Sequence, residues 1–172
     1  MMENIQTQVD SYRFVDRTVR KMARSWIRLE TQREIPWTPL SKPLEECTLA
    51  LITSTGLALK TDQPFDQQGE RENPWWGDPS FRVLPSTTTE EDVRLYHLHI
   101  HPCLAEQDLN TFFPLQRLSE LESRGEIGRS AASHYSYMGF IMQPQMLLEE
   151  YVPAMIDQMK REAVDAVVLV PG

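Results

Sequence analysis

Three histidines near the middle of the 172-residue chain have the types and spacing to do chemistry. Single apolar residues separate His97, His99 and His101. In an extended strand the side-chain period is two residues, so the three imidazoles would share one face. Pro102 would end this strand, which predicts that His101 lies at the edge of a sheet, where α/β proteins place their chemistry.

The histidine-rich strand has more than one interpretation. The imidazoles can form the polar face of a half-exposed strand that binds nothing. Neutral imidazole is also a common metal ligand, so His97, His99 and His101 can instead hold Zn or Fe. The same side chains are suited to proton transfer during catalysis. These alternatives stay open, and the sequence assigns no cofactor beyond Zn or Fe.

Polar residues that follow the histidines extend the candidate site. Asp108 and Asn110 come after a short loop, and Cys103 is the thiol nearest to the histidines. The fourth histidine, His134, lies further along between small residues and tyrosines. We predict that the three histidines face a common cavity and that Asp108 or His134 reaches it from another segment.

A second candidate site follows the continuous apolar run at residues 47–53. Such a run predicts a strand that is buried on both faces, as in a parallel sheet. The small residues after it, Ser54, Thr55 and Gly56, form either a plain tight turn or a turn whose N–H groups bind an anion or carboxylate. Thr55 and Gly56 are therefore candidate substrate-binding residues.

Other periodic segments supply the rest of the fold. Residues 11–32 combine an apolar stripe at helical spacing with a basic stripe, which predicts an amphipathic helix. Its apolar face belongs to the core or to an oligomer contact, and its basic stripe is either solvated or docks an acidic partner. Residues 164–170 form a second apolar run that follows a helical segment, as in a βαβ unit.

These segments predict an α/β fold: a single domain with a mostly parallel sheet flanked by helices. The sheet should contain strands near Leu49, Leu95 and Val167. We expect residues 47–53 and 164–170 to be neighbouring or near-neighbouring parallel strands, buried on both faces. Residues 1–34 carry the N-terminal amphipathic helix, and residues 35–172 form the α/β domain.

Composition excludes several functional classes. A net charge of −8 argues against nucleic-acid binding. No apolar run approaches the ~20 residues that span a bilayer, so no membrane partner is expected. The polar N-terminus has no secretory signal, which predicts a cytoplasmic location. The two cysteines form no CxxC pair and suggest no disulfide framework.

Several blocks between about Pro36 and Pro171 occur in a characteristic order. They are residues 37–40 and 42–44, 49–53 with Gly56, 77–82, 97–99, 108–110 with 113–118, 125–128, 134–139 and 164–171. In this order and spacing the chain resembles the selenoprotein B subunit of glycine, sarcosine and betaine reductase and the related D-proline reductase subunit. The resemblance implies a substrate pocket that includes His97, His99, Asp108, Asn110 and His134. Tyr135, beside His134 in the same block, is assigned to substrate binding with it.

The sequence also departs from this family. In the reductases the last strand leads into a loop with selenocysteine or cysteine, whose ionised form is the nucleophile. The sequence stops at Gly172, where that loop would begin, so we expect no thiol-driven cleavage of glycine, sarcosine, betaine or D-proline by this chain alone. His101 stands where relatives carry an acidic residue, and Cys103 has no counterpart in them.

Three functional hypotheses follow. In the first, the protein is an enzyme related to these reductases that acts on a small amino-acid-like or amine substrate. The histidines would bind or protonate the substrate. Asp108 and Asn110 would orient either the histidines or the substrate, and Cys103 would supply a thiol. In the second, the histidines and Asp108 hold Zn or Fe. In the third, the chain is a non-catalytic subunit of a larger complex. The partner is then another subunit, or a second copy joined through the N-terminal helix.

Overall fold

The computed structural model of the protein describes residues 16–29, 37–73, 76–98, 100 and 107–172. The chain separates into two compact units, residues 1–39 and 40–172. The first unit contains helix α1 (Arg17–Leu29), which confirms the predicted helix over its described part. Helix α1 has no acidic residue and five basic ones, namely Arg17, Arg20, Lys21, Arg24 and Arg28.

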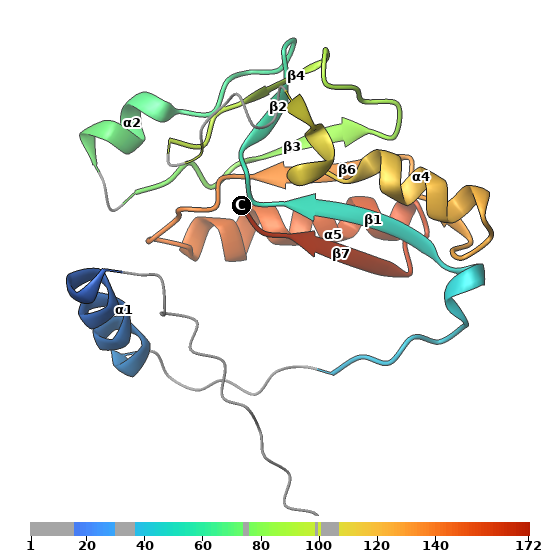
Figure 1. Ribbon diagram of the computed structural model, residues 1–172, viewed down its shortest axis with the longest axis horizontal. Helices are drawn as coiled ribbons and strands as arrows, with labels where there is room; N and C mark the ends of the chain where they lie inside the picture. Colours follow the sequence, from blue (N-terminus) through green and yellow to red (C-terminus); the bar gives the residue numbers. More distant parts are fainter. Residues whose placement is uncertain (1–15, 30–36, 74–75, 99, 101–106) are drawn as a thin grey trace, which may run out of the picture. The chain divides into compact units, whose positions relative to one another are not determined.

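The second unit is built around strand β1 (Thr48–Thr53). Strand β7 (Ala166–Val170) runs parallel to it on one side. Strands β5 (Arg129–Ser130) and β6 (Ser133–Tyr137) run parallel to it on the other side, and β3 (Phe81–Pro85) joins β6 in antiparallel orientation (Figure 1). The sheet is therefore mostly parallel, as the apolar runs predict.

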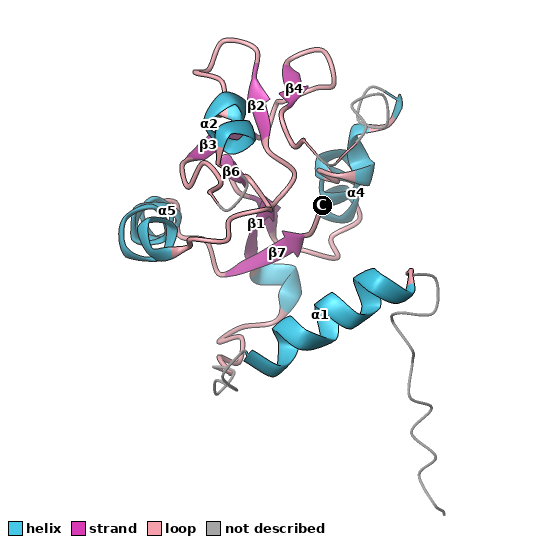
Figure 2. Ribbon diagram, turned by 90° about the vertical axis from the view of Figure 1, so that its left-hand side faces the viewer, coloured by secondary structure: helices cyan, strands magenta, loops and turns pink. Residues whose placement is uncertain are grey.

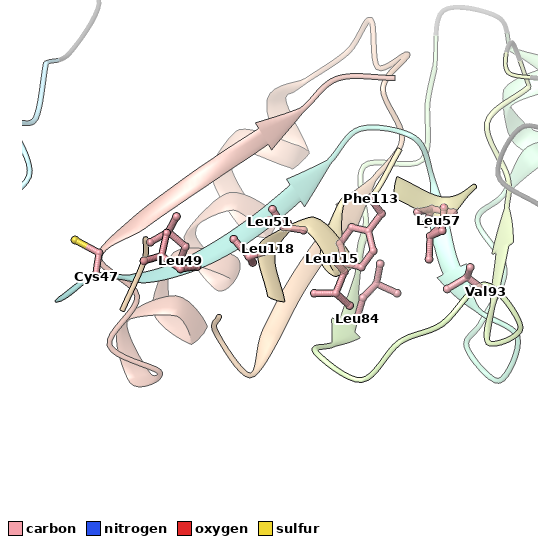
Figure 3. Packing of buried hydrophobic residues seen from close by; sticks show 11 residues of the cluster. Cys47, Leu49, Leu51, Leu57, Leu84, Val93, Phe113, Leu115 and Leu118 are labelled. Carbon is pink, nitrogen blue, oxygen red and sulfur yellow. The ribbon is translucent and has the colours of Figure 1, made fainter. Parts of the chain in front are cut away.

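Helices cover both faces of this sheet. Figure 2 shows α4 (Leu115–Ser123) and α5 (Val152–Arg161) on opposite sides of the strands. On the α4 face, Leu49 and Leu51 of β1 pack with Phe113, Leu115 and Leu118 (Figure 3). On the α5 face the buried cluster consists of Ala50, Ala131, Tyr135, Met155 and Met159. The α/β fold class is thus confirmed.

The shorter elements are η1 (Leu44–Glu46), α2 (Gln67–Glu72), η2 (Leu109–Thr111) and the π-helical turn η3 (Leu147–Tyr151).

The strand near Leu95 does not belong to the parallel sheet, so that part of the prediction is wrong. Strand β4 (Val93–Leu95) pairs with β2 (Leu57–Leu59) in a separate antiparallel sheet of two strands. The physical reason is the turn after β1. Gly56 has φ +65°, a conformation that glycine adopts readily, and it directs the chain away from the main sheet before β2 begins.

The predicted histidine strand is also wrong where residues 96–100 are described. Strand β4 ends at Leu95, and the next two residues, Tyr96 and His97, are both buried, each 8% exposed. Neither residue belongs to a strand. The N–H of Ile100 then donates to the carbonyl oxygen of His97 at 3.4 Å, so the chain turns here. His99, His101 and Cys103 lie outside the described residues.

The prediction for residues 47–53 and 164–170 is only partly correct. Strands β1 and β7 are parallel neighbours, and β1 is buried along nearly its whole length. Strand β7 is not buried on both faces: Val167, Val168 and Leu169 are 37%, 40% and 72% exposed. An apolar run indicates where a strand forms, but not whether helices extend far enough to cover it.

The burial difference between β1 and β7 gives a test of the core. Leu51 of β1 is 1% exposed, whereas Leu169 of β7 is 72% exposed. We predict that Leu51→Ala lowers the free energy of unfolding by about 2–5 kcal/mol, because it leaves a cavity in a packed core. Leu169→Ala should change it by less than about 1 kcal/mol. Urea unfolding followed by circular dichroism measures both, and equal losses would contradict this placement of the core.

Candidate functional site

The carboxyl ends of three strands meet at one edge of the sheet. The N–H of Ser54, just after β1, donates to the carbonyl of Val170 in β7 at 3.1 Å. The N–H of Gly56 donates to the carbonyl of Tyr137 in β6 at 2.9 Å. The N–H of Gly172 donates to Oγ of Ser54 at 3.0 Å, and Figure 1 places the C-terminus at this edge. Because α/β sheets bind ligands outside the carboxyl ends of their strands, this edge is the candidate site.

His97 reaches the same edge from the segment after β4. A Cβ atom at Gly139 would lie 3.2 Å from Nε2 of His97, 3.3 Å from Oγ of Ser54 and 2.6 Å from the Ser54 carbonyl oxygen. The imidazole and the hydroxyl therefore both lie against the backbone of residue 139. Gly139 is exposed while His97 is buried. A mostly buried imidazole next to an exposed glycine can bind a small ligand or exchange a proton with it.

Three hydroxyl groups lie buried at the ends of β1 and β6. Oγ1 of Thr53 and Oγ1 of Thr55 form a hydrogen bond at 2.9 Å, and both residues are fully buried. Ser136 is the neighbour of Thr53 across the two strands, and its buried Oγ has no hydrogen-bond partner among the described residues. The edge thus has a polar interior. A buried hydroxyl without a partner is costly unless another group satisfies it.

Of the two alternatives for the turn after β1, its hydrogen bonds favour the plain tight turn. Two of its amides, those of Ser54 and Gly56, already donate to carbonyls of β7 and β6. Thr55 forms an isolated bridge with Met138. These bonds arise because the turn is held between two neighbouring strands. The turn therefore offers the side-chain hydroxyl of Ser54 rather than a row of free backbone N–H groups.

His134 and Tyr135 lie inside the sheet. Nδ1 of His134 accepts the N–H of Leu51 at 3.0 Å, and Nε2 lies 3.2 Å from Oγ of Ser130. Burial lowers the pKa of His134 to about 4, so its ring is neutral at physiological pH. Tyr135 is fully buried on the α5 face, and burial raises its pKa to about 12. Their substrate-binding roles stay predictions, because both side chains are enclosed by the protein.

Asp108 and Asn110 form a cap at the start of η2. The carboxylate of Asp108 accepts hydrogen bonds from the backbone N–H and from Nδ2 of Asn110, both at 2.9 Å. The hydrogen bond from the Asn110 side chain lowers the pKa of Asp108, and the one from the backbone lowers it further. Asn110 also lines a cavity of about 320 Å³. The other lining residues are Ser86, Thr87, Thr88, Thr89, Glu90, Leu109, Phe113, Leu115, Gln116 and Ser119.

The structure therefore shows the predicted site residues that it describes in three locations. Thr55, Gly56 and His97 meet at the carboxyl edge, His134 and Tyr135 lie within the sheet, and Asp108 and Asn110 cap η2. Sequence reasoning missed Ser54 and Gly139 as members of the edge. Both flank predicted residues in the sequence, but only the fold brings residues 54, 97 and 139 together.

The metal prediction stays a prediction, because two of its three histidines lie outside the described residues. Among the residues that are described, no group of three or more His, Cys, Asp or Glu side chains is arranged to hold a metal ion. The cysteine in this part of the chain, Cys47, is buried, and its Sγ lies 3.3 Å from the Pro43 carbonyl oxygen. No helix in the described ranges is long and apolar enough to cross a membrane.

Comparison with known proteins defines the class to which the chain belongs. The sequence profile of glycine/sarcosine/betaine reductase selenoprotein B matches residues 3–171, so the chain belongs to that family. It is 32% identical over 157 residues to the D-proline reductase subunit gamma of Acetoanaerobium sticklandii. This match covers 91% of the chain and 62% of the length of that relative. No solved structure matches the chain.

The buried His134 predicts a specific dependence of stability on pH. Its pKa is about 4 in the folded protein and about 6.5 in the unfolded chain, so between these values the unfolded state binds more protons. Stability should therefore fall as pH drops from 6.5 to 4, by on the order of 3 kcal/mol from this residue.

The matched control for this effect is His134→Asn, whose amide oxygen can still accept the N–H of Leu51. Urea unfolding at several pH values should show that the variant lacks the part of the pH dependence that belongs to His134. Parallel curves for the two proteins between pH 4 and 6.5 would mean that His134 is not buried in its neutral form.

Proposed function

We propose that the chain is a subunit of a reductase of the glycine, sarcosine, betaine and D-proline type and binds a small amino-acid-like or amine substrate at the carboxyl edge. Family membership supports the reductase class. The name of the relative, D-proline reductase subunit gamma, refers to a subunit and to D-proline, a small cyclic amino acid. Extending both properties to this chain is part of the proposal.

The observation that carries the proposal is the approach of Nε2 of His97 and Oγ of Ser54 to Gly139. An imidazole can donate to a substrate carboxylate or transfer a proton to an amine, and a hydroxyl can donate or accept. Position 139 has no room for a side chain, because a Cβ there would lie 2.6 Å from the Ser54 carbonyl oxygen. A small zwitterion therefore suits this edge better than a bulky ligand does.

The proposal retains the other predicted residues in supporting roles. His99, His101 and Cys103 follow His97 closely in the sequence and would extend the same site. Asp108 and Asn110 cap η2, and we keep as a prediction that they orient the histidines. These residues are included because they lie close to His97 in the sequence and because the chain resembles the family.

Substitution of His97 tests the proposal directly. We predict that the purified chain binds at least one of glycine, sarcosine, betaine or D-proline, and that His97→Ala weakens this binding at least tenfold, because the imidazole is lost. Isothermal titration calorimetry measures the affinity. Lys160→Ala, an exposed position on α5, serves as the control and should leave the affinity unchanged. Equal affinity of His97→Ala and the unmodified chain for every ligand would refute the proposal.

Gly139 provides an independent test that leaves the imidazole in place. We predict that Gly139→Ala weakens binding of the same ligand at least fivefold, since the new Cβ would crowd His97 and Ser54. Thermal unfolding followed by circular dichroism verifies that the variant is folded. Undiminished affinity in a folded Gly139→Ala protein would mean that the ligand binds elsewhere.

A further inference from the structure

Helix α1 carries a stripe of positive charge along one side. Its basic residues at positions 17, 21, 24 and 28 are separated by four, three and four residues. At 3.6 residues per turn these positions lie within about 60° of one another around the helix, and the stripe is about 16 Å long. Arg20 lies next to the stripe, and α1 contains no acidic residue.

The same side of the helix borders a cavity of about 610 Å³. The described residues that line this cavity all belong to α1, namely Arg17, Arg20, Lys21, Arg24, Ser25 and Arg28. Five of these six side chains are cationic and the sixth is a hydroxyl, so an occupant must bring negative charge. The volume lies within the roughly 300–1,000 Å³ that is usual for binding clefts.

The charges of the stripe are not neutralised within the described part of the chain. Arg17, Lys21 and Arg28 are exposed, and no described residue forms an ion pair with them. Arg20 and Arg24 have other interactions within the chain. Like charges three or four residues apart on a helix repel one another and destabilise it. An acidic partner offsets this repulsion, whereas salt only screens it.

The charge of the rest of the chain disfavours large anionic surfaces as partners. Helix α1 contributes five positive charges to a chain whose net charge is −8, so the other residues together carry −13. Nucleic acid or an anionic membrane would face this negative charge as well as α1 and would be repelled by it. A short acidic segment can contact α1 alone, so the stripe suits a polypeptide partner.

The spacing of the stripe favours a helical partner over an extended one. Successive basic positions rise by about 6.0, 4.5 and 6.0 Å along α1. Carboxylates at the same 4-3-4 spacing on another helix lie at the same heights, in either orientation because the spacing is symmetric. Alternate side chains of an extended segment are about 6.8 Å apart and lose this register after the second contact.

We propose that α1 docks an acidic helix of a partner polypeptide whose carboxylates lie on one face at 4-3-4 spacing. Arginine suits this role, because its guanidinium group can bind a carboxylate with two parallel hydrogen bonds. A second copy of the chain does not supply the partner helix. None of the helices that the structure describes carries four acidic residues at this spacing.

Docking at α1 is independent of the proposed substrate site. Ser54, His97 and Gly139 belong to the second unit of the chain, whereas α1 belongs to the first. Loss of peptide binding at α1 would therefore leave the substrate-binding proposal standing, and loss of substrate binding would leave docking standing.

Two synthetic helical peptides of identical composition serve as probes for the full chain. Each contains four glutamates among alanines and glutamines, which favour helix. In the one-face peptide the glutamates have 4-3-4 spacing, and in the scattered peptide they are spread around the helix. We predict that fluorescence anisotropy at low salt shows the one-face peptide to bind at least tenfold more tightly, because only its carboxylates meet the whole stripe.

Reversal of the exposed charges places the binding on α1. The triple variant Arg17→Glu, Lys21→Glu and Arg28→Glu should bind the one-face peptide at least tenfold more weakly than the unmodified chain does. Glutamine replaces glutamate at the three positions if circular dichroism shows a loss of helix, since it removes the charge and keeps a helix former.

A matched control separates this effect from a change in total charge. The triple variant Arg71→Glu, Arg94→Glu and Lys160→Glu changes three exposed cations of the second unit by the same total charge. It should bind the one-face peptide within about threefold of the unmodified chain, because surface charges more than a Debye length away are largely screened.

Four results would overturn the proposal. The first is equal binding of the two peptides, which would show unspecific attraction. The second is binding that the α1 variant does not weaken. The third is tighter binding of duplex DNA or of phosphatidylserine vesicles than of the one-face peptide. The fourth is a dimer of the free chain in analytical ultracentrifugation that the α1 variant dissociates, because a second copy would then occupy the stripe.

Discussion

The fold depends on the position of β1 between parallel strands on both sides. Each central residue of β1 has a partner in β7 on one side, and the ends of the strand pair with β5 and β6 on the other. The elements packed on the two faces of the sheet then bury β1, so that the core consists of one cluster under α4 and another under α5. Parallel pairing also brings the carboxyl ends of β1, β6 and β7 to one edge, where Ser54 and Gly172 meet.

The candidate site at that edge combines residues that are distant in sequence. Ser54 follows β1, Gly139 follows β6, and His97 arrives from the small antiparallel sheet. The turn at Gly56 connects the two sheets and lets the segment containing His97 return to the edge. The N–H of Tyr96 donates to the carbonyl oxygen of Gly56 at 2.9 Å, which holds that segment in place. The chain as a whole belongs to the selenoprotein B family.

Sequence patterns predicted the parts of the fold that depend on local composition. The two apolar runs at residues 47–53 and 164–170 correctly indicated neighbouring parallel strands, and the amphipathic pattern indicated α1. The alternation of apolar residues and histidines that begins at Tyr96 and His97 wrongly indicated a strand. Tyr96 packs on Phe65 and the chain turns at His97, and these interactions outweigh the strand tendency of the local sequence. The exposure of Leu169 and the contact of Ser54, His97 and Gly139 depend on which elements meet in space, so no local pattern contains them.

The most direct measurement of the central claim is a map of ligand-induced chemical-shift changes in ¹⁵N-labelled protein, including the imidazole nitrogens of the histidines. Titration with D-proline and with glycine should shift the signals of Ser54, Gly56, His97 and Gly139 first and most strongly. Shifts centred instead on the cavity lined by Thr88, Asn110 and Gln116, or no shifts with any of the family's substrates, would contradict the account.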